Sequence, residues 1–283
     1  MANNLTQIKR RLHAVEGTGK ITKSMELLST VKSQRLKREV ERSQSYFESL
    51  GYLLSDLFYF GKIEDNFYLK EGPKDLPSLY IVLGSDLGLC GSYNQDVIRL
   101  ALSTIEPEDK ILVIGKKIEK TLREKSAAEV FNTKDISYDS SLQNFEKLSK
   151  TLLKLFKNKK IRNVFIVGTH FINSLKSVPV LYRILPFYIE RKKWENEEAC
   201  PPLLDNPAEE IIDRLWESYL VGEIQHLFKD SELSEHTARR NAMEEANKNV
   251  DELTNELTIK YNKQRQEKIT EEITEITASR MAM

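Results

Sequence analysis

Apolar side chains recur at three- and four-residue steps through the first 57 residues of the chain. That spacing places them on one narrow face of a helix, as in the seam of a coiled coil. The predicted seam contains Leu5, Ile8, Leu12, Val15, Ile21, Met25, Leu28, Leu36, Val40, Phe47, Leu50, Leu54 and Leu57. Gly17 and Gly19 interrupt it, and residues 29–35 are nearly all polar.

A second periodic stretch covers residues 207–276. Pro207 suits a first helical turn, and Asn206 before it is a suitable cap. The predicted seam contains Ile212, Leu215, Tyr219, Leu220, Ile224, Leu227, Met243, Ala246, Val250, Leu253, Leu257, Tyr261, Ile269, Ile273 and Ile276. We expect residues 230–234 to disturb the helix, and we expect the seam to pair with the N-terminal helix in antiparallel fashion or with other chains.

The distribution of proline and glycine along the sequence also predicts a long helix at each end of the chain. All eight prolines lie between Pro73 and Pro207, and Gly222 is the only glycine after Pro207. Proline breaks a helix and glycine weakens it, so their scarcity at both ends favours uninterrupted helix.

The middle of the chain alternates short apolar runs with amphipathic stretches. Strands are predicted at residues 79–83, 111–114, 129–131, 164–167 and 178–186, and helices at 93–104, 116–125 and 141–157. This alternation indicates an α/β fold with a mainly parallel sheet. We therefore predict three parts: an N-terminal helix at 1–60, an α/β domain at 76–195 and a C-terminal helix at 207–283, with a linker at 196–206.

Composition narrows the classes of function. The chain has 43 Lys plus Arg and 43 Asp plus Glu, and this balance argues against nucleic acid as a partner. The N-terminal stretch is biased towards bases and the C-terminal stretch towards acids, which favours their pairing. Cys90 and Cys200 have no spacing typical of a metal site or a disulfide framework. No signal peptide and no apolar run of membrane-spanning length is evident, so we expect any contact with a membrane to be indirect.

The glycine-rich segment from Gly84 to Asn94 (GSDLGLCGSYN) follows the first predicted strand. Its glycine spacing fits neither the dinucleotide fingerprint nor the Walker loop, so a structural turn is favoured, with Cys90 as a small buried residue. The four histidines have no metal-binding spacing, and we expect His13 and His236 to face solvent. We therefore identify no catalytic, cofactor or metal site.

Three segments resemble the gamma subunit of bacterial F-type ATP synthases. They are KITKSMELLSTVK (Lys20–Lys32), SDLGLCGSYN (Ser85–Asn94) and the stretch from Ala238 to Ile276 that begins ARRNAMEEANKNVDEL. The resemblance implies an antiparallel coiled coil formed by the N- and C-terminal helices, with a Rossmann-like central domain. It implies a central rotor shaft that couples rotation, and thereby proton transport, to conformational change at catalytic sites on other chains.

The resemblance also implies partners and contact residues. The expected partners are the alpha and beta subunits of the catalytic ring, the epsilon subunit and, in an ordinary synthase, the membrane c-ring. MgATP or ADP is expected on those partners and no cofactor on this chain, which would lie peripherally at the cytoplasmic face of the cell membrane. Contacts with the ring are implied for Lys20, Lys23, Met25, Arg239, Arg265, Gln266, Thr270 and Glu272.

Two alternatives stay open, the first of them because some positions depart from the family pattern. Leu87 stands where the family commonly has arginine, and Arg280 lies near a C-terminal tip that is usually apolar. One alternative is a gamma-like shaft in a paralogous ATPase motor, such as mollicutes use for surface movement, without a proton channel. The other is an α/β enzyme with helical oligomerisation arms, which requires a catalytic constellation within residues 79–190.

Overall fold

The computed structural model describes residues 2–61, 66–132, 142–188 and 203–281. The chain divides into two compact units. One consists of residues 1–30 with 239–283, and the other of residues 31–238. Cys200 and most of the predicted linker lie outside the described residues.

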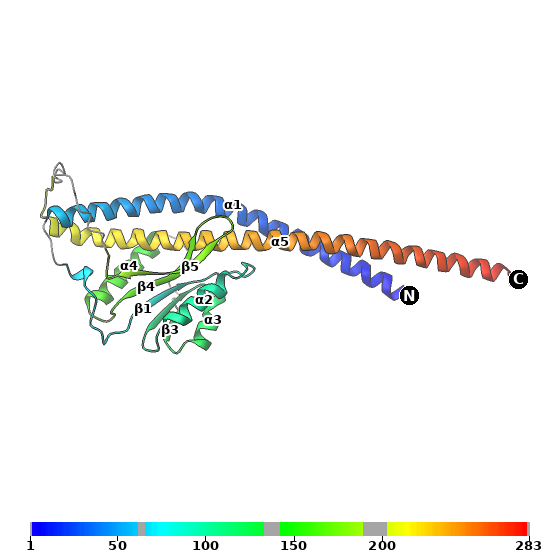
Figure 1. The fold of residues 1–283 in the computed structure, drawn as a ribbon, viewed down its shortest axis with the longest axis horizontal. Helices are drawn as coiled ribbons and strands as arrows, with labels where there is room; N and C mark the ends of the chain where they lie inside the picture. Colours follow the sequence, from blue (N-terminus) through cyan, green and yellow to red (C-terminus); the bar gives the residue numbers. More distant parts are fainter. Residues whose placement is uncertain (1, 62–65, 133–141, 189–202, 282–283) are drawn as a thin grey trace. The chain divides into compact units, whose positions relative to one another are not determined.

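Two long helices begin and end the described chain, as Figure 1 shows. Helix α1 covers Ala2–Phe60 and helix α5 covers Ala208–Met281. The predicted long terminal helices are therefore confirmed. The predicted disturbance at residues 230–234 is wrong, because α5 continues through them without a break.

A five-stranded sheet forms the centre of the larger unit. Its strands are β1 (Leu79–Leu83), β2 (Lys110–Ile114), β3 (Glu129–Asn132), β4 (Val164–Phe171) and β5 (Ser177–Leu185). They lie in the order β3-β2-β1-β4-β5, and all neighbouring pairs are parallel except β4 with β5. The α/β prediction is confirmed, and the antiparallel edge arises because a tight turn around Asn173 joins β4 directly to β5.

Helices cover both faces of the sheet. Helices α2 (Tyr93–Thr104) and α3 (Lys116–Lys125) pack on one face, and α4 (Leu142–Lys157) and α5 pack on the other. A short 3-10 helix, η1 (Phe67–Leu69), follows the gap after α1. The strand residues alternate between the two cores, so Val82 and Val113 contact the α2–α3 side while Ile81 and Leu112 face α4 and α5.

Aromatic packing joins the larger unit's parts of α1 and α5 to this sheet. Trp216 of α5 is fully buried, and its ring stacks on Phe187 with 4.2 Å between the ring centroids. Phe58 of α1 contacts the same indole, at 5.9 Å. Removing an aromatic side chain from such a core costs about 3–5 kcal/mol, so this cluster anchors both helices to the α/β fold.

Two buried serines explain why α5 stays helical where a disturbance was expected. Ser231 Oγ lies 2.8 Å from the hydroxyl of Tyr93 and accepts a hydrogen bond from the Thr169 amide at 3.4 Å. Ser234 donates to the Thr169 carbonyl at 3.3 Å. Polar residues that weaken an isolated helix therefore serve here as contacts with strand β4.

Asp230 extends this polar contact by one residue. Its side chain is 4% exposed, and one carboxylate oxygen lies 2.6 Å from Nδ1 of His170. The other oxygen accepts from the Phe171 amide at 3.1 Å. His236, one turn further along α5 than Glu232, is also buried, so the expectation that it faces solvent is wrong. His13 is exposed as expected.

Candidate functional site

The outer parts of α1 and α5 pair with each other in the smaller unit. Gly19 of α1 lies against Val250 of α5, and Thr22 lies against Asn247. Residue numbers rise along α1 as they fall along α5, so the two helices are antiparallel. This confirms the predicted coiled coil and provides the frame for the implied contact residues.

Gly19 allows the two helices to approach closely. A Cβ atom built on Gly19 would lie 2.7 Å from Cγ1 of Val250, which is too close for ordinary packing. At Gly17 the same atom would meet nothing within 4 Å. Of the two glycines that interrupt the sequence pattern, Gly19 is therefore the one that the interface requires.

A polar relay crosses the interface one turn after this close approach. Thr22 donates a hydrogen bond to the side-chain carbonyl of Asn247, whose amide donates to Glu26 at 2.6 Å. Lys23 donates to the same carboxylate at 3.0 Å. The hydrogen bond from Lys23 lowers the pKa of Glu26, and the bond from Asn247 and the charge of Arg240 act in the same direction. The relay therefore fixes the register of the helices around a charged group.

The relay changes which α1 residues face α5. Thr22 and Ser29 are buried, whereas Ile21 and Leu28 are 63% and 64% exposed. The prediction that Ile21 and Leu28 lie in the seam is therefore wrong. The contact here is close and polar, so small residues occupy it and the larger apolar residues point outwards.

The predicted seam residues differ in their burial. Met243 and Leu257 are buried, whereas Leu5, Ile8, Leu12, Val15 and Val250 are partly exposed. Leu253 is 40% exposed. The seam is therefore only partly closed by the two helices.

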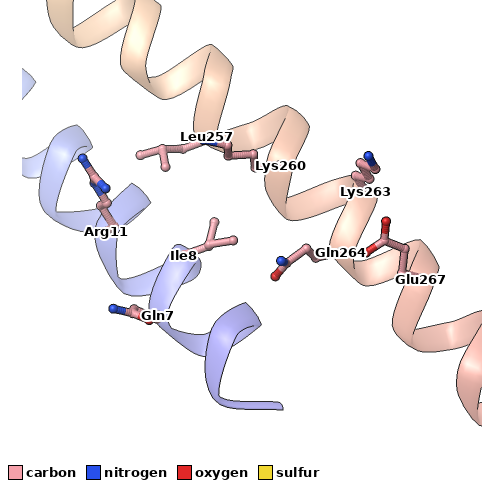
Figure 2. Close-up of a pocket in the computed structure, with 8 residues that line it drawn as sticks. All are labelled: Gln7, Ile8, Arg11, Leu257, Lys260, Lys263, Gln264 and Glu267. Carbon is pink, nitrogen blue, oxygen red and sulfur yellow. The ribbon is translucent and has the colours of Figure 1, made fainter. Parts of the chain in front are cut away.

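A cavity of about 500 Å³ opens between the helices near the start of α1. It is lined by Gln7, Ile8, Arg11, Leu257, Lys260, Lys263, Gln264 and Glu267. Figure 2 shows Ile8 of α1 and Leu257 of α5 extending into the space between the two helices. The helices are thus less tightly packed here than at Gly19.

The eight implied contact residues fall into three groups. Lys20 and Lys23 are exposed on α1 and Met25 is partly buried, while Arg239 of α5 is 3% exposed. Arg265, Gln266, Thr270 and Glu272 are all exposed on α5. Glu272 pairs with Lys268 at 3.4 Å, and Thr270 donates to the Gln266 carbonyl of its own helix. The structure does not bring the α5 residues Arg265, Gln266, Thr270 and Glu272 together with the α1 residues Lys20, Lys23 and Met25.

An apolar stripe accompanies the exposed α5 residues. Ile269, Ile273 and Ile276 are 45%, 59% and 61% exposed, at steps of four and three residues. On α1, Leu27 is 56% exposed beside Ile21 and Leu28. Apolar residues at helical spacing that stay exposed are typical of a surface that another chain covers. Sequence periodicity placed Ile21, Leu28 and the three α5 isoleucines in the predicted seams but did not include Leu27.

The glycine-rich turn after β1 uses its polar groups internally. The Ser85 amide donates to Asn94 Oδ1 at 3.0 Å, and the Lys116 amide donates to Asp86 at 3.1 Å. Cys90 is buried and lies 3.3 Å from the Asn94 side-chain nitrogen. The Ser85 amide and the Asp86 carboxylate are therefore occupied by contacts within the protein, and the predicted burial of Cys90 is confirmed.

Within the described ranges, no group of three or more metal-ligating side chains comes together.

One carboxyl group has an unusual environment. Glu223 of α5 lies in the larger unit, and burial raises its pKa to about 8. Its Oε2 has no hydrogen-bond partner among the residues that the structure describes. None of the described helices is both long enough and apolar enough to cross a membrane.

Comparison with known proteins gives consistent results over almost the entire chain. The family model described as ATP synthase matches residues 4–283. The ATP synthase gamma chain of Clostridium novyi is 30% identical over 98% of both chains. That of Mesoplasma florum is 30% identical over 99% of both, and that of Clostridium kluyveri is 32% identical over 99% of this chain and 98% of the relative.

Solved structures share the fold. A chain of the mitochondrial ATP synthase of Euglena gracilis, in a structure of OSCP, F1 and the c-ring, has a TM-score of 0.66. The match covers 100% of this chain and 95% of the other at 17% identity. A chain of the central stalk and c-ring of the Tetrahymena thermophila enzyme has a TM-score of 0.55 at 20% identity, over 80% of this chain and 99% of the other.

Proposed function

Because this chain belongs to the family of ATP synthase gamma chains, we propose that it is the central rotor shaft of an ATP synthase. The observation that carries the proposal is the end-to-end family match over residues 4–283. The antiparallel coil of α1 and α5 is consistent with it, since a shaft must keep its two helices in register while force acts on them.

The mechanism follows from the asymmetry of the coil. The shaft can shift the conformational equilibrium of a ring subunit only by the difference between its contact energies with the two states of that subunit. Exposed Ile21, Leu27 and Leu28 beside Lys20 and Lys23 give α1 an apolar and basic surface. Helix α5 instead presents the isoleucines at 269, 273 and 276 with Arg265 and Glu272. Each subunit of the ring would therefore meet a different surface as the shaft turns.

The partners follow from this role. Alpha and beta subunits would surround the coil and contact Lys20, Lys23, Met25, Arg239, Arg265, Gln266, Thr270 and Glu272, while the α/β fold would meet the epsilon subunit and the c-ring. MgATP or ADP would bind the ring subunits, and this chain would carry no cofactor, no catalytic site and no nucleic acid. The shaft would lie peripherally at the cytoplasmic face of the cell membrane.

The first test is affinity purification of the tagged full chain from its native cell, with mass spectrometry of the chains that come with it. Recovery of alpha, beta, epsilon and c-type subunits supports the proposal. Catalytic ring subunits with unfamiliar proteins and no c-type subunit would support the paralogous motor instead. Absence of every ring subunit would overturn the shaft role, and ATP turnover by the chain alone would favour an enzyme. The comparisons with known proteins support neither alternative.

A second test addresses the α1 surface. Leu28→Glu replaces an exposed apolar residue, so the isolated chain should keep its stability while ATP hydrolysis by the assembled complex falls. Leu175→Glu, at an 87% exposed position in the turn between β4 and β5, is the matched control. Equal hydrolysis by both variants and the wild type would remove Leu28 from the contact surface.

A further inference from the structure

A second cavity lies in the larger unit, between α4 and the β3 end of the sheet. Its volume is about 530 Å³, within the range of about 300–1,000 Å³ that ligand pockets occupy. Half of the lining residues are aliphatic, namely Leu79, Leu112, Leu148, Leu152, Leu155 and Ile161, and Phe131 lies among the others. Leu112 and Phe131 are neighbours across the β2–β3 pair, and Phe131 is 39% exposed. Among the residues that the structure describes, this end of the sheet is thus less completely covered than its centre.

The cavity is elongated along α4. The helix contributes residues 144, 147, 148, 151, 152 and 155, which share one face through three turns. At 1.5 Å per residue, this face extends for about 16 Å. Its apolar part, from Leu148 to Leu155, extends for about 10 Å, and a narrow apolar surface of this kind fits an extended chain better than a compact ring system.

Basic side chains border the apolar lining. The described lining residues include Lys110, Lys147 and Lys160 and no carboxylate. Lys110 lies over the Phe131 ring, 5.6 Å from its centroid, and 3.9 Å from a carboxylate oxygen of Glu129 outside the cavity. Lys147 and Lys160 are exposed. Lysine stems often cover apolar surface, but here a space of ligand size stays open beside them.

We propose that this cavity binds a single-chain amphipathic anion of the fatty-acid class. The alkyl chain lies along α4 beside Leu148, Leu152 and Leu155. The carboxylate lies near Lys160, which follows the end of α4 next to Leu155, and Lys147 borders the other end of the same face. Burial of the chain supplies most of the binding free energy, and the lysines select an anionic head. The ligand site does not depend on the shaft role, because every residue in it belongs to the α/β fold and α4.

The test uses the purified full chain and isothermal titration with sodium dodecanoate below its micelle concentration. Dodecanoate is expected to bind with one-to-one stoichiometry. We expect 1-dodecanol to bind more weakly because it lacks the charge, and octanoate to bind more weakly because its alkyl chain is shorter. Lys147→Glu combined with Lys160→Glu should weaken dodecanoate about tenfold or more, since attraction becomes repulsion.

Two further variants separate the site from general effects. Lys154→Glu makes the same charge change on α4 at an exposed position outside the cavity, and it should leave binding unchanged. Thr151→Trp fills the cavity from an exposed position and should abolish binding while the helical circular dichroism stays the same. Absence of dodecanoate binding to the wild type would overturn the proposal, as would equal binding by the wild type and Thr151→Trp.

A protein partner is the competing occupant. If dodecanoate does not bind, and Thr151→Trp instead causes loss of one subunit from the affinity-purified complex, the cavity is a protein contact and the ligand proposal is wrong. If the complex assembles normally with every variant and dodecanoate binds as described, the cavity is a ligand site whether or not the shaft proposal survives its own test.

Discussion

The close approach at Gly19 gives a prediction with a matched control on the same helix. Replacing either Gly17 or Gly19 by Ala removes backbone freedom from the interior of α1, which should stabilise the helix by about 1 kcal/mol. At Gly17 nothing opposes that gain, because the new Cβ meets no atom within 4 Å. At Gly19 the Cβ would lie 2.7 Å from Val250 Cγ1, and valine is stiff about its first side-chain torsion.

The magnitude follows from these two terms. Overpacking a close contact typically costs about 1–3 kcal/mol, so Gly19→Ala should be neutral to destabilising by about 2 kcal/mol. The two alanine variants should therefore differ by about 1–3 kcal/mol, although their chemistry is identical. Adding Val250→Ala to Gly19→Ala removes the opposing methyl groups and should recover part of the difference.

Hydrogen exchange on the full chain measures this locally. Amides of residues 12–26 and 243–257 report the opening free energy of the coil without requiring the larger unit to unfold. Protection should rise in Gly17→Ala and stay unchanged or fall in Gly19→Ala. If Gly19→Ala raised protection as much as Gly17→Ala, the helices would not approach closely at this point and the reasoning would fail.

Three further predictions address the seam, a buried carboxyl group and the exposed end of α5. Leu257→Asp should destabilise the coil by about 2 kcal/mol or more because it places a charge at a 6% exposed position, and Leu253→Asp should cost much less; equal loss of exchange protection would count against the observed register. Burial raises the pKa of Glu223 from 4.5 to about 8. Between these two pH values the folded state keeps a proton that the unfolded state has lost, so the stability of the fold falls as pH rises until the pH passes about 8. Glu223→Gln should therefore be more stable than the wild type at pH 9 in urea denaturation, and an unchanged difference between pH 6 and pH 9 would contradict this. Arg265→Ala with Gln266→Ala should lower ATP hydrolysis by the assembled complex while the stability of the isolated chain changes by no more than about 0.5 kcal/mol; unaffected hydrolysis would remove both from the contact surface.

The sequence by itself determined the elements and the class of fold. The absence of proline from both ends required long helices, and the apolar runs located the five strands, four of them to within a residue or two. Strand β4 extends four residues past its predicted end, to Phe171, because the turn at Asn173 pairs it with β5. These signals are local, since helix and strand propensity and periodicity depend on nearby residues.

Tertiary structure decided which face of each helix meets which partner. Ile21 and Leu28 fit the apolar period as well as any seam residue, but the close contact at Gly19 and the relay through Asn247 turn Thr22 inwards instead. Likewise, Asp230 and Ser231 are weak helix formers in isolation, and only the edge of β4 supplies the hydrogen bonds that keep them helical and buried. The distance between two packed helices and the donors on a neighbouring strand are properties of segments far apart in the chain, so no local pattern contains them.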